Sequence, residues 1–119
     1  MREYKKLDVW KMAVELSTEI YKAAMGFPKS ELYGITSQVQ RSTVSVASNI
    51  AEGAGRGTDK QFSQFLHIAY GSLCELETQL IIAKNLEYIT EDQLTSLSDK
   101  VIHLQKKIYN LDKPLNNQP

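Results

Sequence analysis

Hydrophobic residues recur at helical spacing through most of this 119-residue chain. The most regular pattern lies between residues 62 and 83, where apolar positions follow one another at intervals of four and three: Phe62, Leu66, Ala69, Leu73, Leu76, Leu80 and Ala83. Such a heptad seam is typical of a helix that packs against other helices. The pattern predicts a long helix over residues 59–87 with one continuous buried face.

The stretch from residue 38 to residue 53 is rich in β-branched residues, which would also suit a strand. It is too long for an ordinary strand. At about 100° per residue, its polar residues Arg41, Ser45, Ser48 and Glu52 lie within roughly 60° of one another. On the far side of the helix lie the apolar residues Ile35, Val39, Val46 and Ile50, and a third, small-residue strip consists of Val44, Ala47 and Ala51. We predict a helix over residues 31–53 that packs on more than one side.

Two further helices are predicted over residues 8–25 and 91–111. In the first, Asp8 is a candidate N-cap, and one face holds Trp10, Ala13, Val14, Ser17, Tyr21 and Ala24, with Leu16 and Ile20 beside it. The last repeats the three-four spacing with Leu94, Leu97, Val101, Leu104, Ile108 and Leu111. The sequences Thr58–Gln61 and Thr90–Gln93 both match a capping box at a helix start. Residues 112–119 are predicted as a frayed tail.

Four helices with short connections predict an all-α protein with a single domain over residues 1–119, folded as an antiparallel up-down-up-down four-helix bundle. The side of helix 59–87 opposite the seam is not plainly polar. It carries small or apolar residues: Gly71, Cys74, Thr78, Ile81 and Ile82. A second such face needs another partner, so these residues are our candidate oligomer interface. We interpret the single cysteine, Cys74, as a buried and inert thiol.

The charges balance, with 14 Lys and Arg against 14 Asp and Glu. Strong nucleic-acid binders usually carry a basic excess, so nucleic-acid binding would need a local patch. The candidate residues for phosphate contact are Lys5, Lys6, Arg41, Arg56, Lys60, Lys106 and Lys107. The first residues lack the apolar core of a signal peptide, and no apolar run reaches the length of a membrane span. We therefore expect a cytoplasmic protein.

We find no residue set for catalysis, a metal or a cofactor. His67 and His103 follow Gln64 and Lys100 by three residues, whereas di-iron bundles use Glu-x-x-His. The glycines at positions 53–57 lack the lysine of a phosphate-binding loop. Glu75 and Glu77 are two positions apart on a helix and point in different directions. The sequence therefore predicts a protein that is not an enzyme.

The polar stripe of helix 31–53 has two interpretations. In the first, it belongs to an internal polar network of Arg41, Ser45, Asn49, Glu52 and Glu75, with Glu75 as a candidate partner for Arg41, because buried charges need partners. Glu52 and Gly53 then end the helix and steer the turn. In the second, the stripe is a binding strip, and Arg41 contacts phosphate or another protein. The residues favour the first interpretation and leave the second open.

Two motifs in this order carry a resemblance: Ser45-x-x-x-Asn-Ile-Ala-Glu-Gly53 and Gly71-Ser-x-x-Glu-Leu76. From about Leu7 to Leu111 the chain resembles the bacterial four-helix bundle proteins encoded in intervening sequences of 23S rRNA genes. It is also similar to the accessory variability determinant of diversity-generating retroelements. The resemblance implies a homo-oligomer, a pentameric ring with a central channel, and in the retroelement relatives a barrel that binds nucleic acid and a reverse transcriptase.

Two functional hypotheses follow from these observations. The first is a non-catalytic, homo-oligomeric four-helix bundle that acts as a scaffold associated with RNA or ribonucleoprotein. The alternative is a protein–protein interaction module with no nucleic-acid role, which presents the small-residue face around Gly71 and Thr78 to its own copies or to another helix.

Overall fold

The computed structural model describes residues 2–116, and within this range the chain is helical and contains no strand. Its secondary structure comprises two short 3₁₀ turns, η1 (Tyr4–Lys6) and η2 (Lys29–Glu31), and the helices α1 (Asp8–Ala24), α2 (Ile35–Ala54), α3 (Asp59–Asn85) and α4 (Glu91–Asn116). The predicted all-α class and the presence of four helices are thereby confirmed.

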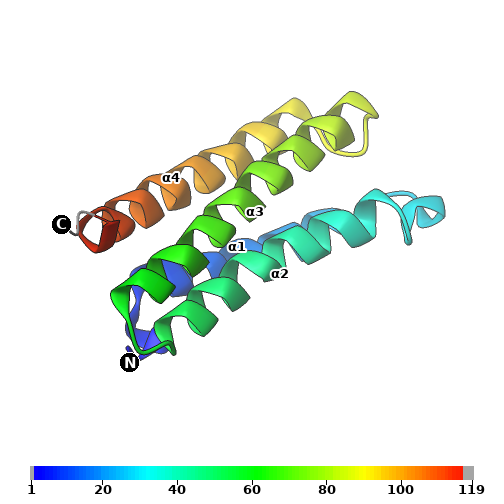
Figure 1. Cartoon of the computed structure of the whole chain (residues 1–119). Helices are drawn as coiled ribbons and strands as arrows, with labels where there is room; N and C mark the ends of the chain where they lie inside the picture. The colour runs from blue at the N-terminus through cyan, green and yellow to red at the C-terminus, as the bar shows by residue number, and fades with distance from the viewer. Residues whose placement is uncertain (1, 117–119) are drawn as a thin grey trace.

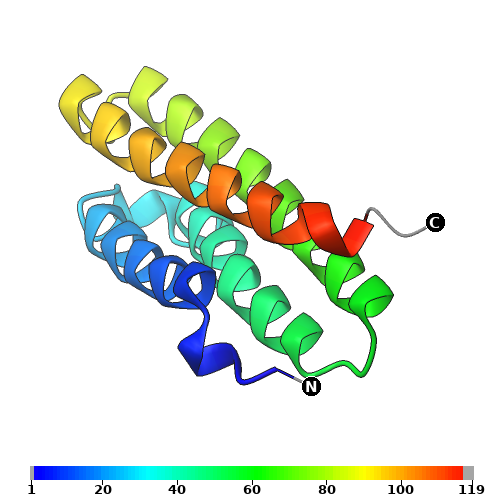
Figure 2. The ribbon, with the colours of Figure 1, turned by 90° about the vertical axis from the view of Figure 1, so that its left-hand side faces the viewer.

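The helices pack as an elongated bundle of 48 × 22 × 21 Å. Each helix contacts the next one along the chain, and α1 also contacts α4 (Figures 1 and 2). At one end, the Arg2 amide donates to the Ala54 carbonyl over 2.9 Å, which holds the N-terminal segment beside the end of α2. At the other end, the rings of Phe27 and Tyr88 lie 5.7 Å apart, which brings the segment before α2 against the segment before α4.

The predicted seams of the last two helices form the centre of the bundle. Every seam residue of α3 is at most 1% exposed, and on α4 Val101, Leu104 and Ile108 are equally buried. The buried face of α1 differs from the predicted one, because Val14 and Tyr21 are 38% and 43% exposed. Ala13 and Ala24 of the predicted face are buried, as are Leu16 and Ile20 beside it and Val9, which was not predicted. The buried face is rotated around the helix axis by about one residue position from the predicted face, because α1 packs against both α2 and α4.

Both predicted helix caps are confirmed, but only the one at Thr90 is a complete capping box, because there the Gln93 side chain also accepts the Thr90 amide over 2.8 Å. The Thr58 hydroxyl accepts the Gln61 amide over 3.1 Å, and the Thr90 hydroxyl accepts the Gln93 amide over 3.1 Å. Asp8, in contrast, is the first residue of α1 and not its cap. The N-cap is Leu7, and no side chain bonds to the free amides there. The Asp8 carboxylate still lies in the first turn, where a negative charge is favourable.

Helix boundaries differ from the predicted ones for local reasons. The predicted helix 31–53 begins only at Ile35, because Gly34 has a non-helical backbone and the preceding residues form η2. The predicted helix 59–87 ends at Asn85, and Glu87 turns the chain with a left-handed φ of 66°. α1 ends at Ala24 rather than at residue 25.

The prediction of a frayed tail from residue 112 onward is wrong for residues 112–116, which are helical. α4 continues through Pro114 to Asn116, and residues 117–119 lie outside the described range. The extension is held to α3 by Asp112, which is 7% exposed and accepts a hydrogen bond from the Ser63 hydroxyl over 2.5 Å. A buried carboxylate with partners on α3 keeps these last turns helical.

Gly53 serves packing rather than the turn that the sequence suggested. The residue is buried within α2, which continues to Ala54. A Cβ atom at position 53 would lie 2.5 Å from the Cβ of Phe65 and 3.1 Å from Cδ1 of Phe62. Glycine therefore allows α2 and α3 to approach closely just before their connecting turn.

Candidate interaction surfaces

A polar contact zone joins α2 to α3 in the middle of the bundle. The Ser42 hydroxyl lies 2.8 Å from Oε1 of Glu75 and 2.9 Å from Oε1 of Gln79. One turn further along α2, the Ser45 and Ser72 hydroxyls are 2.9 Å apart, and the Asn49 amide donates to the Ser45 carbonyl over 2.8 Å. These bonds satisfy polar groups at a tight helix–helix contact.

The predicted polar network is therefore realised only in part. Ser45 and Asn49 contact each other, and Glu75 is bonded to α2, but its partner is Ser42 and not Arg41. Arg41 is exposed, and its guanidinium contacts the Ser37 hydroxyl over 3.3 Å. Glu52 pairs with Arg56 at 3.7 Å on the surface. The two charged residues of the stripe, Arg41 and Glu52, are both exposed. The side of α2 that packs against α3 is the one that carries Ser42 and Ser45.

Ser42 and Thr43 were missed as core residues. Both are buried, at 3% and 0% exposure, and the Thr43 carbonyl accepts a hydrogen bond from the Ser17 hydroxyl of α1 over 3.1 Å. A signal was present in the sequence, because Ser42 lies three residues after Val39 and four before Val46, on the apolar side of the helix.

A second polar cluster, which the sequence analysis also missed, joins α3 to the end of α4. Asp112 accepts from Ser63, and its other oxygen lies 2.7 Å from Nε2 of His67 and 2.9 Å from the Asn116 amide. The carboxylate stands between the hydroxyl and the imidazole, so the described bonds join Ser63 to Asp112 and not to His67. The cluster is a structural clamp and lacks the geometry of a nucleophilic triad.

The outward side of α3 is an exposed and almost uncharged surface. We call it the α3 strip, and it consists of Gln64, Ile68, Gly71, Cys74, Glu75, Thr78, Ile81 and Ile82. The predicted interface residues all belong to it. Ile68, Ile81 and Ile82 are 44–51% exposed, and a Cβ added at Gly71 would meet no atom within 4 Å. Large apolar groups in an exposed row are typical of a surface that another molecule covers.

Cys74 corrects one prediction about this strip. The thiol is exposed rather than buried, and Nε2 of Gln105 lies 3.4 Å from its sulfur. The error arose because the apolar neighbours of Cys74 in the sequence belong to the exposed strip and not to the core.

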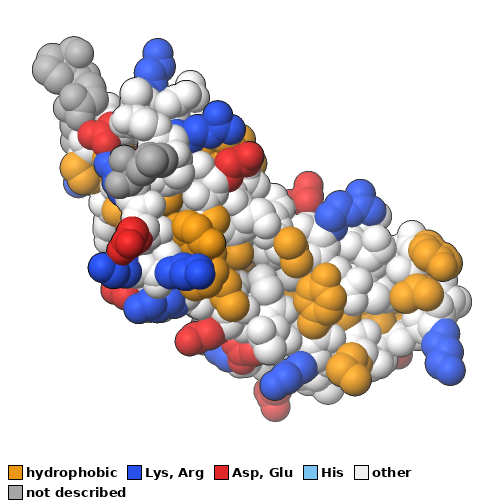
Figure 3. All heavy atoms as spheres, turned by 90° about the horizontal axis from the view of Figure 1, so that it is seen from below, with side chains coloured by type: hydrophobic (Ala, Val, Ile, Leu, Met, Phe, Trp, Pro, Cys, Tyr) orange, Lys and Arg blue, Asp and Glu red, His pale blue; other side chains and the backbone are white. Residues whose placement is uncertain are grey.

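A second apolar surface lies in a groove between α1 and α2. We call it the α1–α2 groove, and its volume is about 530 Å³. Its apolar lining includes Val14, Tyr21, Met25, Val44 and Ala47. Met25 is 84% exposed. Figure 3 shows one face of the molecule, on which hydrophobic side chains gather between interspersed basic and acidic ones.

The candidate phosphate-contacting cations are all exposed, but they do not form one patch. Lys5, Lys6, Arg56 and Lys60 lie at the end of the bundle that holds η1 and the turn between α2 and α3. Arg41 lies on α2, and Lys106 and Lys107 lie on α4. Acidic neighbours neutralise part of the group at the bundle end, because Lys6 pairs with Glu3 at 2.8 Å and Arg56 pairs with Glu52. Arg2 pairs with Asp59 at the same end.

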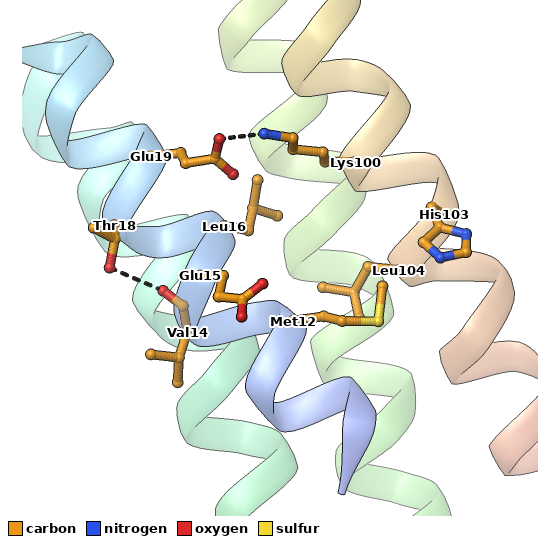
Figure 4. A pocket seen from close by; sticks show the side chains of 9 residues that line it. All are labelled: Met12, Val14, Glu15, Leu16, Thr18, Glu19, Lys100, His103 and Leu104. Carbon is orange, nitrogen blue, oxygen red and sulfur yellow. Dashed lines mark hydrogen bonds and ion pairs between the residues drawn. The ribbon is translucent and has the colours of Figure 1, made fainter.

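A cleft of about 700 Å³ separates α1 from α4 (Figure 4). The Met12 side chain extends from α1 toward Leu104, and an ion pair between Glu19 and Lys100 spans the cleft. His103 lies on its α4 side and is exposed. Within residues 2–116, no three His, Cys, Asp or Glu side chains come together in a way that could hold a metal ion.

Most of the chain matches the model of one protein family. Residues 5–110 match the model of the 23S rRNA-intervening sequence proteins. This chain belongs to that family. It is also similar to a crystal structure of a protein with unknown function from the S23 ribosomal protein family of Bacteroides thetaiotaomicron. The two chains are 25% identical with a TM-score of 0.79, and the match covers 88% of this chain and 98% of the other.

Two further findings complete the comparison. No curated protein matches this chain. Among the described residues, none of the helices is both long enough and apolar enough to cross a membrane.

Proposed function

We propose that this chain of the 23S rRNA-intervening sequence family is a non-catalytic, homo-oligomeric bundle with up-down-up-down topology that serves as a cytoplasmic scaffold associated with RNA or ribonucleoprotein. The observation that carries the proposal is the α3 strip. A solvent-facing helix surface normally carries many charges. Over residues 61–76 of α3, Glu75 is the only acidic or basic residue apart from His67.

The strip also has a partner surface of the same chain. The α1–α2 groove is apolar and lies on other helices than the strip. Two different apolar surfaces on one chain fit a head-to-tail contact, in which the strip of one copy enters the groove of the next. Such contacts close into rings when the rotation between copies allows it. The pentameric ring implied by the family resemblance is one such closure.

The RNA part of the proposal rests on the family and on the cations around η1 and the turn between α2 and α3. In a ring, each copy would repeat this group, so Lys5, Lys60 and their neighbours would form a circle of positive charge. Binding to phosphates through such a circle releases counterions and weakens steeply with salt. A structured RNA that binds equally at low and high salt, or not at all at low salt, would exclude this role.

The protein interaction module remains the second candidate function. It is favoured by the ion pairs Arg2–Asp59, Lys6–Glu3 and Arg56–Glu52, which neutralise part of the positive charge at that end. Light scattering with and without a structured RNA separates the two candidates. An oligomer that gains RNA mass supports the scaffold, whereas an oligomer whose mass is unchanged by RNA supports the interaction module.

A further inference from the structure

Arg41 and Glu75 have opposite signs and are among the exposed charged residues that form no ion pair within residues 2–116. Arg41 on α2 contacts only the neutral Ser37 hydroxyl at 3.3 Å. Glu75 on α3 accepts the Ser42 hydroxyl at 2.8 Å, and no basic group lies within ion-pair distance. The other two arginines of the chain, Arg2 and Arg56, are both paired with carboxylates. Arg41 and Glu75 are therefore available for a partner outside the chain.

Each of these charges stands alone on an otherwise uncharged helix surface. Arg41 is the only charged residue of α2 between Ile35 and Ala51. Glu75 is the only charged residue of the α3 strip. A surface that covers either strip would remove the charge from water, which costs free energy unless an opposite charge meets it. Arg41 follows Gln40, which lines the α1–α2 groove, and Lys22 lines the same groove. The charges on this side are basic, so they are complementary to Glu75 of the α3 strip.

The two charges also lie at the same level along the bundle. Ser42 follows Arg41 directly and contacts Glu75, which sets the level of α2 against α3. Ser17 of α1 contacts Thr43 at this same level. A rotation about an axis parallel to the long axis of the bundle does not shift any residue along that axis. A ring built on such an axis can therefore bring Arg41 of one copy against Glu75 of the next.

The apolar residues beside the two charges match in the same register. From Ser17, α1 continues through Tyr21 and Met25 toward Phe27, and from Glu75, α3 continues through Ile81 and Ile82 toward Tyr88. Phe27 and Tyr88 are in contact, so both runs lead to the same end of the bundle. The register that pairs the charges therefore also sets Ile81 and Ile82 opposite the exposed Tyr21 and Met25.

We propose that Arg41 forms an ion pair with Glu75 of the neighbouring copy and sets the register of the homo-oligomer. This inference rests on the proposed oligomer and names the residues that join its copies. The planar guanidinium can bind a carboxylate through two parallel hydrogen bonds, which lysine cannot do. The Ser42 hydroxyl holds the carboxylate in place for this contact.

Charge reversal tests the pair by light scattering. Arg41→Glu sets two carboxylates against each other between copies, and Glu75→Arg sets two guanidinium groups against each other. Each variant should associate at least about tenfold more weakly than the wild type, which corresponds to about 1.4 kcal/mol. Circular dichroism should show unchanged helicity for Arg41→Glu, because the side chain is exposed. Lys107→Glu on α4 is the matched control and should keep the wild-type mass.

Mixing the two variants distinguishes a contact between copies from one within a chain. The carboxylate introduced by Arg41→Glu can meet the guanidinium introduced by Glu75→Arg, so the mixture should regain part of the mass that each variant alone has lost. Two kinds of chain cannot alternate throughout a ring of five, so at least one contact in such a ring still sets like charges against each other. The double variant should also assemble. Single variants that keep the wild-type mass, or a double variant that is helical but stays dissociated, would overturn the pair while leaving the proposed oligomer intact. A monomeric wild-type protein would overturn both.

Discussion

Replacing glycine by alanine should have opposite effects on stability at positions 53 and 71. Both lie inside long helices, where replacing glycine by alanine stabilises by about 1 kcal/mol if there is room. Beyond the adjoining part of its own helix, a Cβ at Gly71 meets no atom of residues 2–116 within 4 Å, whereas a Cβ at Gly53 would lie 2.5 Å from the Cβ of Phe65. Packing within the chain therefore does not explain the glycine at position 71. We propose that the close approach of a neighbouring copy explains it.

Gly71→Ala should raise the melting temperature of dissociated protein by about 4 °C, from the usual relation between unfolding free energy and temperature for a domain of this size. Gly53→Ala should lower it, because the helix pair must separate, at a cost of about 1–3 kcal/mol for overpacking. Both are measured by circular dichroism at a concentration low enough to exclude association, since assembly otherwise adds to stability.

Gly71→Leu is the stronger perturbation of the proposed interface. It leaves the monomer helical, but a large side chain in the contact should cost about 1–3 kcal/mol of association, roughly a 5- to 150-fold weakening. The assay is the mass in solution over a dilution series. A Gly71→Leu protein that is fully helical and has an unchanged mass at every concentration would refute the use of this surface between copies.

Three other predictions concern the stability of the single chain. Asp112→Ala leaves the buried Ser63 hydroxyl without its acceptor, so thermal unfolding should show a loss of about 1–3 kcal/mol, and amide exchange should show the last turns of α4 opening. The hydrogen bond from Tyr88 to a carboxylate raises the pKa of its phenol above the ordinary value of 10.0. The hydrogen bond between Tyr88 and Glu31 therefore contributes fully to the stability of the folded chain below pH 10, and this contribution is lost as the pH rises through the raised pKa. Tyr88→Phe should be less stable than the wild type at neutral pH, and its unfolding curves should lack this loss of stability at alkaline pH. Thr90→Ala removes the cap of α4 and should cost about 1 kcal/mol, whereas Thr95→Ala, within the exposed part of the same helix, should cost nothing measurable by denaturant titration.

The parts of the fold that the sequence predicted are those set by local or periodic patterns. The seam from Phe62 to Ala83 was identified because core positions of a helix recur every three or four residues. The caps at Thr58 and Thr90 were identified because capping depends on a side chain and an amide only three residues away. Both features require no knowledge of which helix lies opposite.

The parts that the sequence did not predict depend on partners distant in the chain. Asp112 was assigned to a tail because a carboxylate usually marks a surface, and its partner Ser63 is 49 positions away. Ser42 was overlooked for the same reason, since its partners Glu75 and Gln79 lie on another helix. A polar residue in a core register becomes interpretable only when the contact that satisfies it is known.

The same limit applies to the candidate interaction surface. The sequence singled out Gly71, Cys74, Thr78, Ile81 and Ile82 as a second face, and the structure leaves that face exposed. It could not separate this face from a second core, which is why Cys74 was expected to be buried. Nor could it show that Arg41 contacts Ser37, and Glu75 contacts Ser42, rather than each other.

The central claim is that copies of this chain assemble through the α3 strip, and the mass of the purified wild-type protein in solution tests it most directly. One chain weighs 13.5 kDa. Light scattering should give a multiple of this mass, close to five chains for the proposed ring, that holds over a wide range of concentration. A mass of one chain at every concentration would contradict the assembly, and with it the function that we assign to the exposed face of α3.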